Sequence, residues 1–185
     1  MDKKKALEIV QVSGWELQNL PDDSLKKDKE IVLEAVKQYG DVLEWADDSF
    51  KKDKEIVLEA VKSIGRSFDY VDDSLKKHKD IILEAVKQYH KEALEYIDDS
   101  LKKDKEFILE LVNIQGQNLK FADKSLKKDK EIVDAAIEQD ERAINYADKY
   151  FKKDSKITQE IYMKTEPAGR VVFGKLDKTQ EDLFY

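Results

Sequence analysis

The sequence predicts an all-α protein: an α-solenoid of about six 25-residue helix-pair repeats with a short non-repeat C-terminal cap. The first observation is the motif "DDSLKKDKE" at residues 22–30, which returns in five further copies, one identical and four altered. The copies begin 25, 25, 26, 25 and 25 residues apart, at Asp22, Asp47, Asp72, Asp98, Asp123 and Asp148. The second observation is a helical spacing of apolar residues between the copies. So regular a period indicates an array in which each unit packs mainly on its neighbours.

Each unit begins with a long helix, as residues 28–40 illustrate. Asp28 precedes "KEIVLEAVKQY" and is a good N-cap, because its carboxylate can accept hydrogen bonds from the first free N–H groups. The apolar residues that follow form a broad face, which suits a helix placed between two neighbours. Gly40 is expected to end the helix in a left-handed conformation. Equivalent glycines are Gly14, Gly65 and Gly116.

A shorter segment follows, such as "DVLEWA", and we expect a helix of one to two turns there. An aromatic residue two positions before the aspartate marks this segment, and Leu20 replaces it in the first unit. These aromatics, Trp45, Tyr70, Tyr96, Phe121 and Tyr146, are expected to plug the core. One apolar residue in each junction motif is expected to anchor the loop: Leu25, Phe50, Leu75, Leu101, Leu126 or Phe151.

The array is expected to cover residues 1–166, with an opening half-repeat at 1–21 and a last long helix at 155–165. Residues 167–185 no longer follow the repeat and form the predicted cap or tail. The fourth unit is irregular, because His90 stands where glycine is expected and one residue is added. The long helix is expected to run further there or to bulge.

Composition limits the possible functions of the 185-residue chain. Charged residues make up 41% of it, against about 25% in ordinary soluble domains. The net charge is −7, and cysteine is absent, which excludes disulfides and thiolate zinc sites. No apolar run approaches the roughly 20 residues of a membrane span. We therefore expect a cytoplasmic protein without membrane association, and no sequence motif implies a metal or cofactor.

Two charged ladders are the candidate partner-binding surfaces. The first follows the long helices and consists of Glu34, Glu59, Glu84 and Glu110, with Glu8 and Asp134 at its ends. The second follows the junctions and includes Lys27, Lys52, Lys77, Lys103 and Lys128. Lysines at regular spacing can follow a phosphate backbone, but the motif at residues 22–30 carries four acids against three bases.

The repeated "DKEIVLEAVKQYG…LEWADDSFKK" is similar to a helical tandem repeat family of uncharacterised function, domain of unknown function four-one-one-six. The resemblance covers roughly residues 6–155. It implies helical tandem repeats and supplies no activity and no functional residues.

The sequence therefore predicts a non-enzymatic protein–protein interaction module that binds a partner, possibly a basic one, through charged repeat surfaces. An alternative is a small inhibitor or immunity protein that blocks a basic enzyme such as a defence nuclease or toxin. Nucleic-acid binding along the lysine edge is the least favoured of the three. The acidic side chains recur with the repeat, as a structural role requires, so no catalytic residue is predicted.

Overall fold

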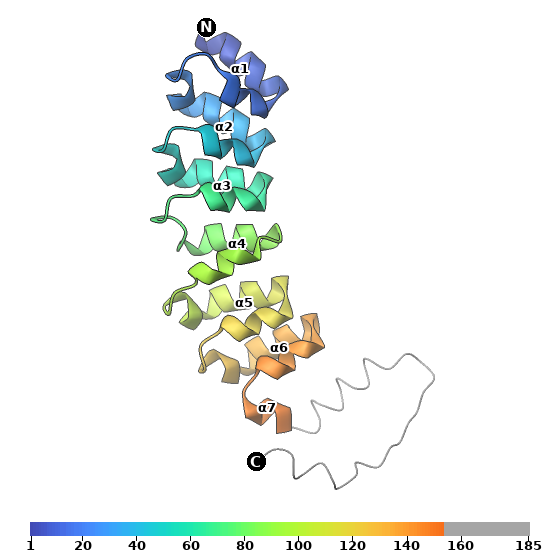
Figure 1. Cartoon of the computed structure of the whole chain (residues 1–185). Helices are drawn as coiled ribbons and strands as arrows, with labels where there is room; N and C mark the ends of the chain where they lie inside the picture. Colours follow the sequence, from blue (N-terminus) through green and yellow to red (C-terminus); the bar gives the residue numbers. More distant parts are fainter. Residues whose placement is uncertain (154–185) are drawn as a thin grey trace, which may run out of the picture. The chain divides into compact units, whose positions relative to one another are not determined.

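A computed structural model describes residues 1–153, and all elements in this part of the chain are helices. Six long α-helices recur along the array: α1 (Lys3–Val12), α2 (Lys29–Gln38), α3 (Lys54–Ser63), α4 (Lys79–Lys87), α5 (Lys105–Ile114) and α6 (Lys130–Gln139). Each packs on the next, and the colours of Figure 1 follow them in order from blue to orange. The α-solenoid is confirmed. The last long helix expected at 155–165 and the cap expected at 167–185 lie outside the described residues.

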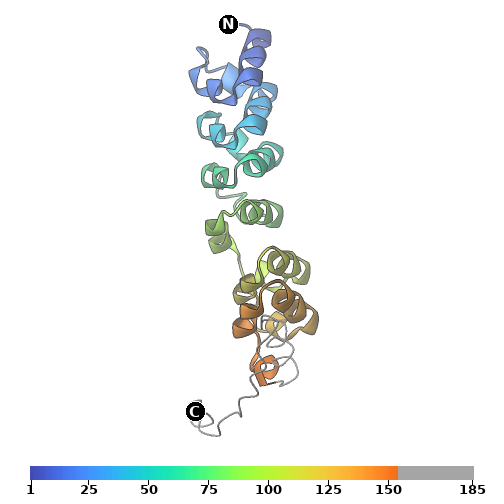
Figure 2. The same cartoon turned by 90° about the vertical axis from the view of Figure 1, so that its right-hand side faces the viewer.

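Every long helix is followed by a six-residue 3₁₀-helix. These are η1 (Gly14–Asn19), η3 (Gly40–Trp45), η5 (Gly65–Tyr70), η6 (Lys91–Tyr96), η8 (Gly116–Phe121) and η10 (Glu141–Tyr146). In Figure 2 the short helices of the blue-to-green units stand beside the long ones in a second column. The junctions contain single 3₁₀ turns: η2 (Leu25–Lys27), η4 (Phe50–Lys52), η7 (Leu101–Lys103) and η9 (Leu126–Lys128).

The chain divides into two compact units, Met1–Asp148 and Lys149–Tyr185. The first unit contains the whole described array from α1 to η10. Of the second unit the structure describes one short helix, α7 (Lys149–Lys153), which contains the buried Phe151.

The core is built from equivalent positions of successive long helices. In α2 the fully buried side chains are Ile31, Val32, Ala35 and Val36, and α3 buries Ile56, Val57, Ala60 and Val61 in the same order. Leu43 and Ala46 add a second buried row from the short helix, because residues three apart share one face of a 3₁₀-helix.

That geometry corrects the expectation that the repeated aromatics plug the core. Trp45, Tyr70, Tyr96, Phe121 and Tyr146 are all half-buried. Each lies next to the inward-facing row, so its ring covers the margin of the core. The junction anchors are confirmed as buried for Leu25, Phe50 and Phe151, whereas Leu75, Leu101 and Leu126 are half-buried.

The glycines do not adopt the expected left-handed conformation. Tyr39, with φ −146°, ends α2, and Gly40 starts η3. Glycine is needed there because a Cβ at Gly40 would collide with the carbonyl oxygen of Ala60 on α3. A Cβ at Gly14 would likewise lie only 2.5 Å from the carbonyl oxygen of Ala35 in α2. Small residues on both sides thus let each short helix approach the next long helix closely.

The fourth unit ends differently, and its long helix is shorter than the others rather than longer. Tyr89 has φ 64°, and the N–H groups of Tyr89 and His90 donate to the carbonyls of Val86 (3.0 Å) and Ala85 (2.9 Å). This pair of bonds is a Schellman motif, which accommodates the additional residue. Two bulky residues also stand near this irregularity: His90 where α2, α3 and α5 are followed by glycine, and Leu111 of α5 where α2, α3, α4 and α6 have alanine.

Candidate functional site

The lysines of the predicted second ladder do recur along one edge of the array. Each stands at the end of a junction turn and is exposed: Lys27, Lys52, Lys77, Lys103 and Lys128. Lys27 Nζ lies 3.7 Å from Asp47 Oδ2, and Lys52 Nζ lies 3.8 Å from Asp72 Oδ2. The charges of Lys77 and Lys103 lower the pKa values of Asp98 and Asp123 as minor contributors, after the hydrogen bonds of Ser100 and Ser125. The edge is therefore a mixed row of cations and anions.

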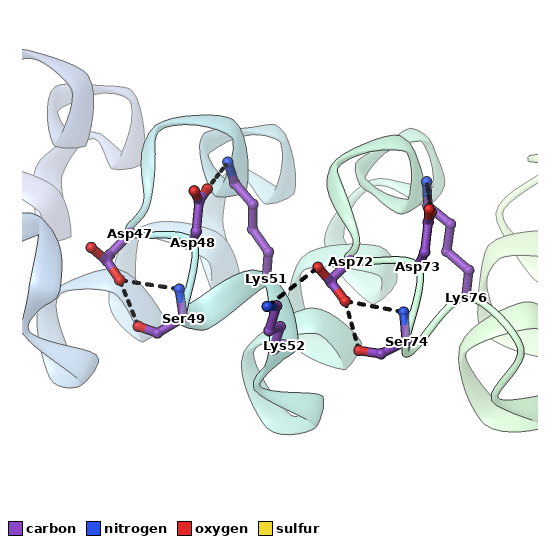
Figure 3. A network of polar contacts seen from close by, with 9 residues as sticks. All are labelled: Asp47, Asp48, Ser49, Lys51, Lys52, Asp72, Asp73, Ser74 and Lys76. Atoms are coloured by element: carbon purple, nitrogen blue, oxygen red, sulfur yellow. Dashed lines mark hydrogen bonds and ion pairs between the residues drawn. The ribbon is translucent and has the colours of Figure 1, made fainter.

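Figure 3 shows how two neighbouring junctions combine these groups. Lys51 Nζ lies 2.8 Å from Asp48 Oδ1 of its own motif. Asp72 accepts hydrogen bonds from the hydroxyl and the backbone N–H of Ser74, at 2.7 and 3.0 Å, and these bonds lower its pKa. The aspartate thus organises its own turn and also faces Lys52 of the preceding motif. Most of the charge in the motif has a local structural partner.

Backbone hydrogen bonds join successive junctions. The N–H of Asp47 donates to the carbonyl of Lys26 at 3.3 Å, and Asp72 donates to Lys51 at 3.0 Å. Asp123 and Asp148 repeat the bond with Lys102 and Lys127. Asp98 makes no such bond within residues 1–153, so the junction row is interrupted along the fourth unit, between the junction before α4 and the junction after η6.

A third charged ladder was not predicted from the sequence. Lys29, the first residue of α2, places Nζ 2.8 Å from both Asp53 Oδ2 and Glu55 Oε2 at the start of α3. Lys3 and Lys105 bridge to the next helix in the same way. These carboxylates raise the pKa of Lys29. The signal in the sequence was a lysine directly after every N-cap position, but only the stacking of the units shows that it reaches the following cap.

The glutamate ladder differs between its two halves. In α2 and α3, Glu34 and Glu59 pair with lysines three residues later, Lys37 and Lys62, at 3.0 and 2.9 Å. Glu84 lies 3.8 Å from Lys87 in α4. Those three acids are half-buried.

The acids of α5 and α6 depart from this pattern. Glu110 is exposed and forms no ion pair within the described residues, because Asn113 occupies the position of the lysine. In α6 the equivalent residues are Ala135 and Glu138, and Asp134 is one residue out of register and pairs with Lys130. The ladder is therefore locally neutralised in the first half of the array and acidic in α5 and α6.

A buried carboxylate was also not predicted from the sequence. Asp41 is the second residue of the short helix η3 and is almost completely buried. It pairs with Arg66 and accepts a 3.1 Å hydrogen bond from the hydroxyl of Ser67, both from η5. This contact fixes two neighbouring short helices to each other, so its role is structural.

The irregular fourth unit contains an open depression of about 520 Å³. Its polar and aromatic lining comes from η5 and from the segment after α4: Arg66, Asp69, Gln88, Tyr89, His90 and Glu92. A second depression, of about 320 Å³, lies between η6 and η8 and includes Lys91 and Phe121. Thus a depression lies on each side of η6, where His90 and Leu111 depart from the repeat.

None of the helices in the described part of the chain is long and apolar enough to cross a bilayer. No curated protein and no solved structure matches the chain. A family model described as "Domain of unknown function (DUF4116)" matches three times in tandem, at residues 2–51, 53–102 and 104–152. Each match spans two of the 25-residue units, and together the matches cover nearly the whole described array. The chain therefore belongs to the DUF4116 family of tandem helical repeats.

Proposed function

We propose that this chain is a non-enzymatic protein-interaction module that binds a basic protein partner. The observation that supports this most directly is the exposed acidic surface of α5 and α6. Glu110 lacks the lysine that accompanies its equivalents, and Glu138 replaces such a lysine. A regular scaffold with a local change of surface charge suits the recognition of one partner on one part of the array.

The structural roles of the carboxylates support the non-enzymatic part of the proposal. Asp28, Asp53 and Asp129 cap helices, Asp47 and Asp72 organise turns, and Asp41 joins two short helices. A catalytic acid or base would need a sheltered site with a displaced pKa and no such structural duty. The same pairing weakens the nucleic-acid hypothesis, because the junction lysines face aspartates.

An inhibitor of a basic enzyme is the second candidate function. The acidic face of α5 and α6 could occupy a cationic substrate groove, and electrostatic attraction would speed the encounter. This function differs from a general scaffold in its consequence, since the partner enzyme would lose activity when bound.

The test compares two double charge reversals in affinity capture at low and high salt. Glu110→Lys/Glu138→Lys should reduce capture of a basic partner strongly, while Glu34→Lys/Glu59→Lys on α2 and α3 should reduce it less. Captured enzymes are then assayed with and without the chain. Equal capture by both variants would contradict the role of α5 and α6, and a measured turnover by the chain itself would overturn the proposal.

A further inference from the structure

We propose that the depression beside His90 binds an arginine side chain of a partner polypeptide. The inference rests on the proposed role as an interaction module, but it concerns a different site from the acidic surface of α5 and α6. The depression lies between η5 and the residues that follow α4. Its volume of about 520 Å³ exceeds that of one side chain and leaves room for part of the backbone that carries it.

The depression lies where one hydrogen bond that regular units make is missing. In regular units the glycine N–H donates to the last side chain of the next long helix: Gly14 to Gln38 and Gly40 to Ser63, both at 3.2 Å. The equivalent donor is Gly65, and its partner would be Gln88. No hydrogen bond joins Gly65 to the Gln88 side chain within residues 1–153, because α4 ends early and its chain turns away through Tyr89.

His90 lies in this depression, and its side chain is only 10% exposed. Nε2 lies 3.1 Å from Asp69 Oδ1, yet this buried nitrogen makes no hydrogen bond, so the ring N–H direction does not match that oxygen. Nδ1 faces Glu92 Oε2 at 3.4 Å. Buried polar nitrogens are normally hydrogen-bonded, so an unsatisfied one beside two carboxylates indicates a place for a ligand.

The charge of the depression suits a cation. Asp69 and Glu92 are 55% and 72% exposed, and no lysine or arginine of the described residues forms an ion pair with either. Arg66 also lines the depression, but its guanidinium is paired with the buried Asp41 and is therefore neutralised. The two available carboxylates leave the opening acidic.

The shape and chemistry favour a guanidinium over other cations. The two carboxylates face opposite nitrogens of one imidazole, and no group of three metal-ligating side chains occurs in residues 1–153. A guanidinium presents five N–H donors in a planar fork, so it can pair with one carboxylate along an edge and keep donors for the other. Its flat face can also stack on Tyr89, an aromatic side chain that is 88% exposed. A lysine ammonium provides neither the fork nor the plane.

The test is an NMR titration of the full chain with the peptide acetyl-Gly-Arg-Gly-amide, and with matched peptides that carry lysine or citrulline. The arginine peptide should give saturable shifts at the amides of Tyr89 and Glu92. Loss of the charge in citrulline should weaken binding about tenfold, and lysine should bind several-fold more weakly than arginine.

Asp69→Asn and Glu92→Gln should each weaken the arginine peptide by about threefold to tenfold. Glu95→Gln is the matched control, because it removes the same charge from the same short helix outside this depression. Absence of saturable shifts, or equal affinity in all three variants, would overturn the arginine site.

Partner capture distinguishes a failure of the arginine site from a failure of the proposed interaction function. If Asp69→Asn/Glu92→Gln captures the partner as well as the unaltered chain does, the arginine site is wrong and the interaction module stands. If the peptide binds as described and no partner is captured, the site stands and the proposed function fails.

Discussion

Tyr89 shows at the scale of one residue how the array accommodates an irregularity. It is the only non-glycine residue with positive φ in the described part of the chain. In this conformation the Cβ of an L-residue approaches the backbone closely, which costs roughly 1–2 kcal/mol relative to glycine. The Schellman hydrogen bonds of Tyr89 and His90 compensate for this cost.

Tyr89→Gly should therefore stabilise the chain by about 1 kcal/mol, because glycine adopts this conformation without steric cost. Urea denaturation monitored by circular dichroism measures the effect. Tyr39→Gly is the control and should destabilise, since Tyr39 has φ −146° and stacks against Trp15. A loss of stability in Tyr89→Gly would show that the ring contributes more than the backbone conformation costs.

The titration of Asp140 is expected to contribute to stability. The Arg142 side chain donates to both carboxylate oxygens at 3.0 Å, and Gln117 of η8 donates at 2.8 Å. These bonds hold the pKa of Asp140 at about 2. Because the folded pKa lies below the ordinary value of about 3.9, the stabilisation is complete above that value and is lost as the pH falls through about 2.

Asp140→Asn should lower the free energy of unfolding at neutral pH and flatten its fall between about pH 4 and pH 2. Urea midpoints at several pH values test this. Asp134→Asn, on the same unit, replaces an exposed aspartate paired within its own helix and should leave the slope unchanged. Parallel pH profiles for Asp140→Asn and the unaltered chain would contradict the assignment.

At the scale of the element, the N-cap distinguishes α4 from its neighbours. Asp28 and Asp53 accept hydrogen bonds from the second and third N–H groups of α2 and α3. His78 occupies the equivalent position of α4 and makes no side-chain cap hydrogen bond. Helix α4 is thus the least well capped of the helices that follow a junction.

His78→Asp should stabilise the chain by about 1 kcal/mol, since a carboxylate can cap α4 and also attract Lys54 of α3. Thermal and urea denaturation measure the gain. His78→Ala is the control, and it should show no gain. Equal stabilities of the aspartate and alanine variants would mean that water already satisfies the first N–H groups of α4.

At the largest scale, the contacts between units repeat regularly along the array from Met1 to Asp148, except near η6. The backbone bond between junctions is missing at Asp98, a depression lies on each side of η6, and bulky His90 and Leu111 replace small residues. In a repeat array, stability is roughly a sum over units and their interfaces. The contacts of the fourth unit with its neighbours are consequently expected to open most easily.

Hydrogen exchange should show this directly. The Asp98 N–H is expected to exchange at least about tenfold faster than those of Asp72 and Asp123, which are hydrogen-bonded to the preceding junction. Deletion of His90 with Lys91→Gly and Leu111→Ala restores the regular spacing and small residues, and it should slow exchange at Asp98. Uniform exchange at all three aspartates would refute a weak interface.

The sequence by itself determined the period, the long helices, their aspartate caps and the family. These features depend on local chemistry: a capping carboxylate, a helical spacing of apolar residues and a mixed junction motif that recurs in each unit. The sequence also located the irregular unit, because His90 and an additional residue interrupt an otherwise constant spacing.

Only the tertiary structure decided which contacts the regularly spaced residues make between units. Glycine allows the short helix to approach the next long helix closely and does not form a left-handed turn. The aromatic side chains cover the margin of the core because the short segments are 3₁₀-helices. Lys29 reaches Asp53 and Glu55, and His90 meets Asp69, only once the units are stacked. Local propensity cannot specify these contacts, because they join residues about one repeat apart whose relative placement depends on how the units pack.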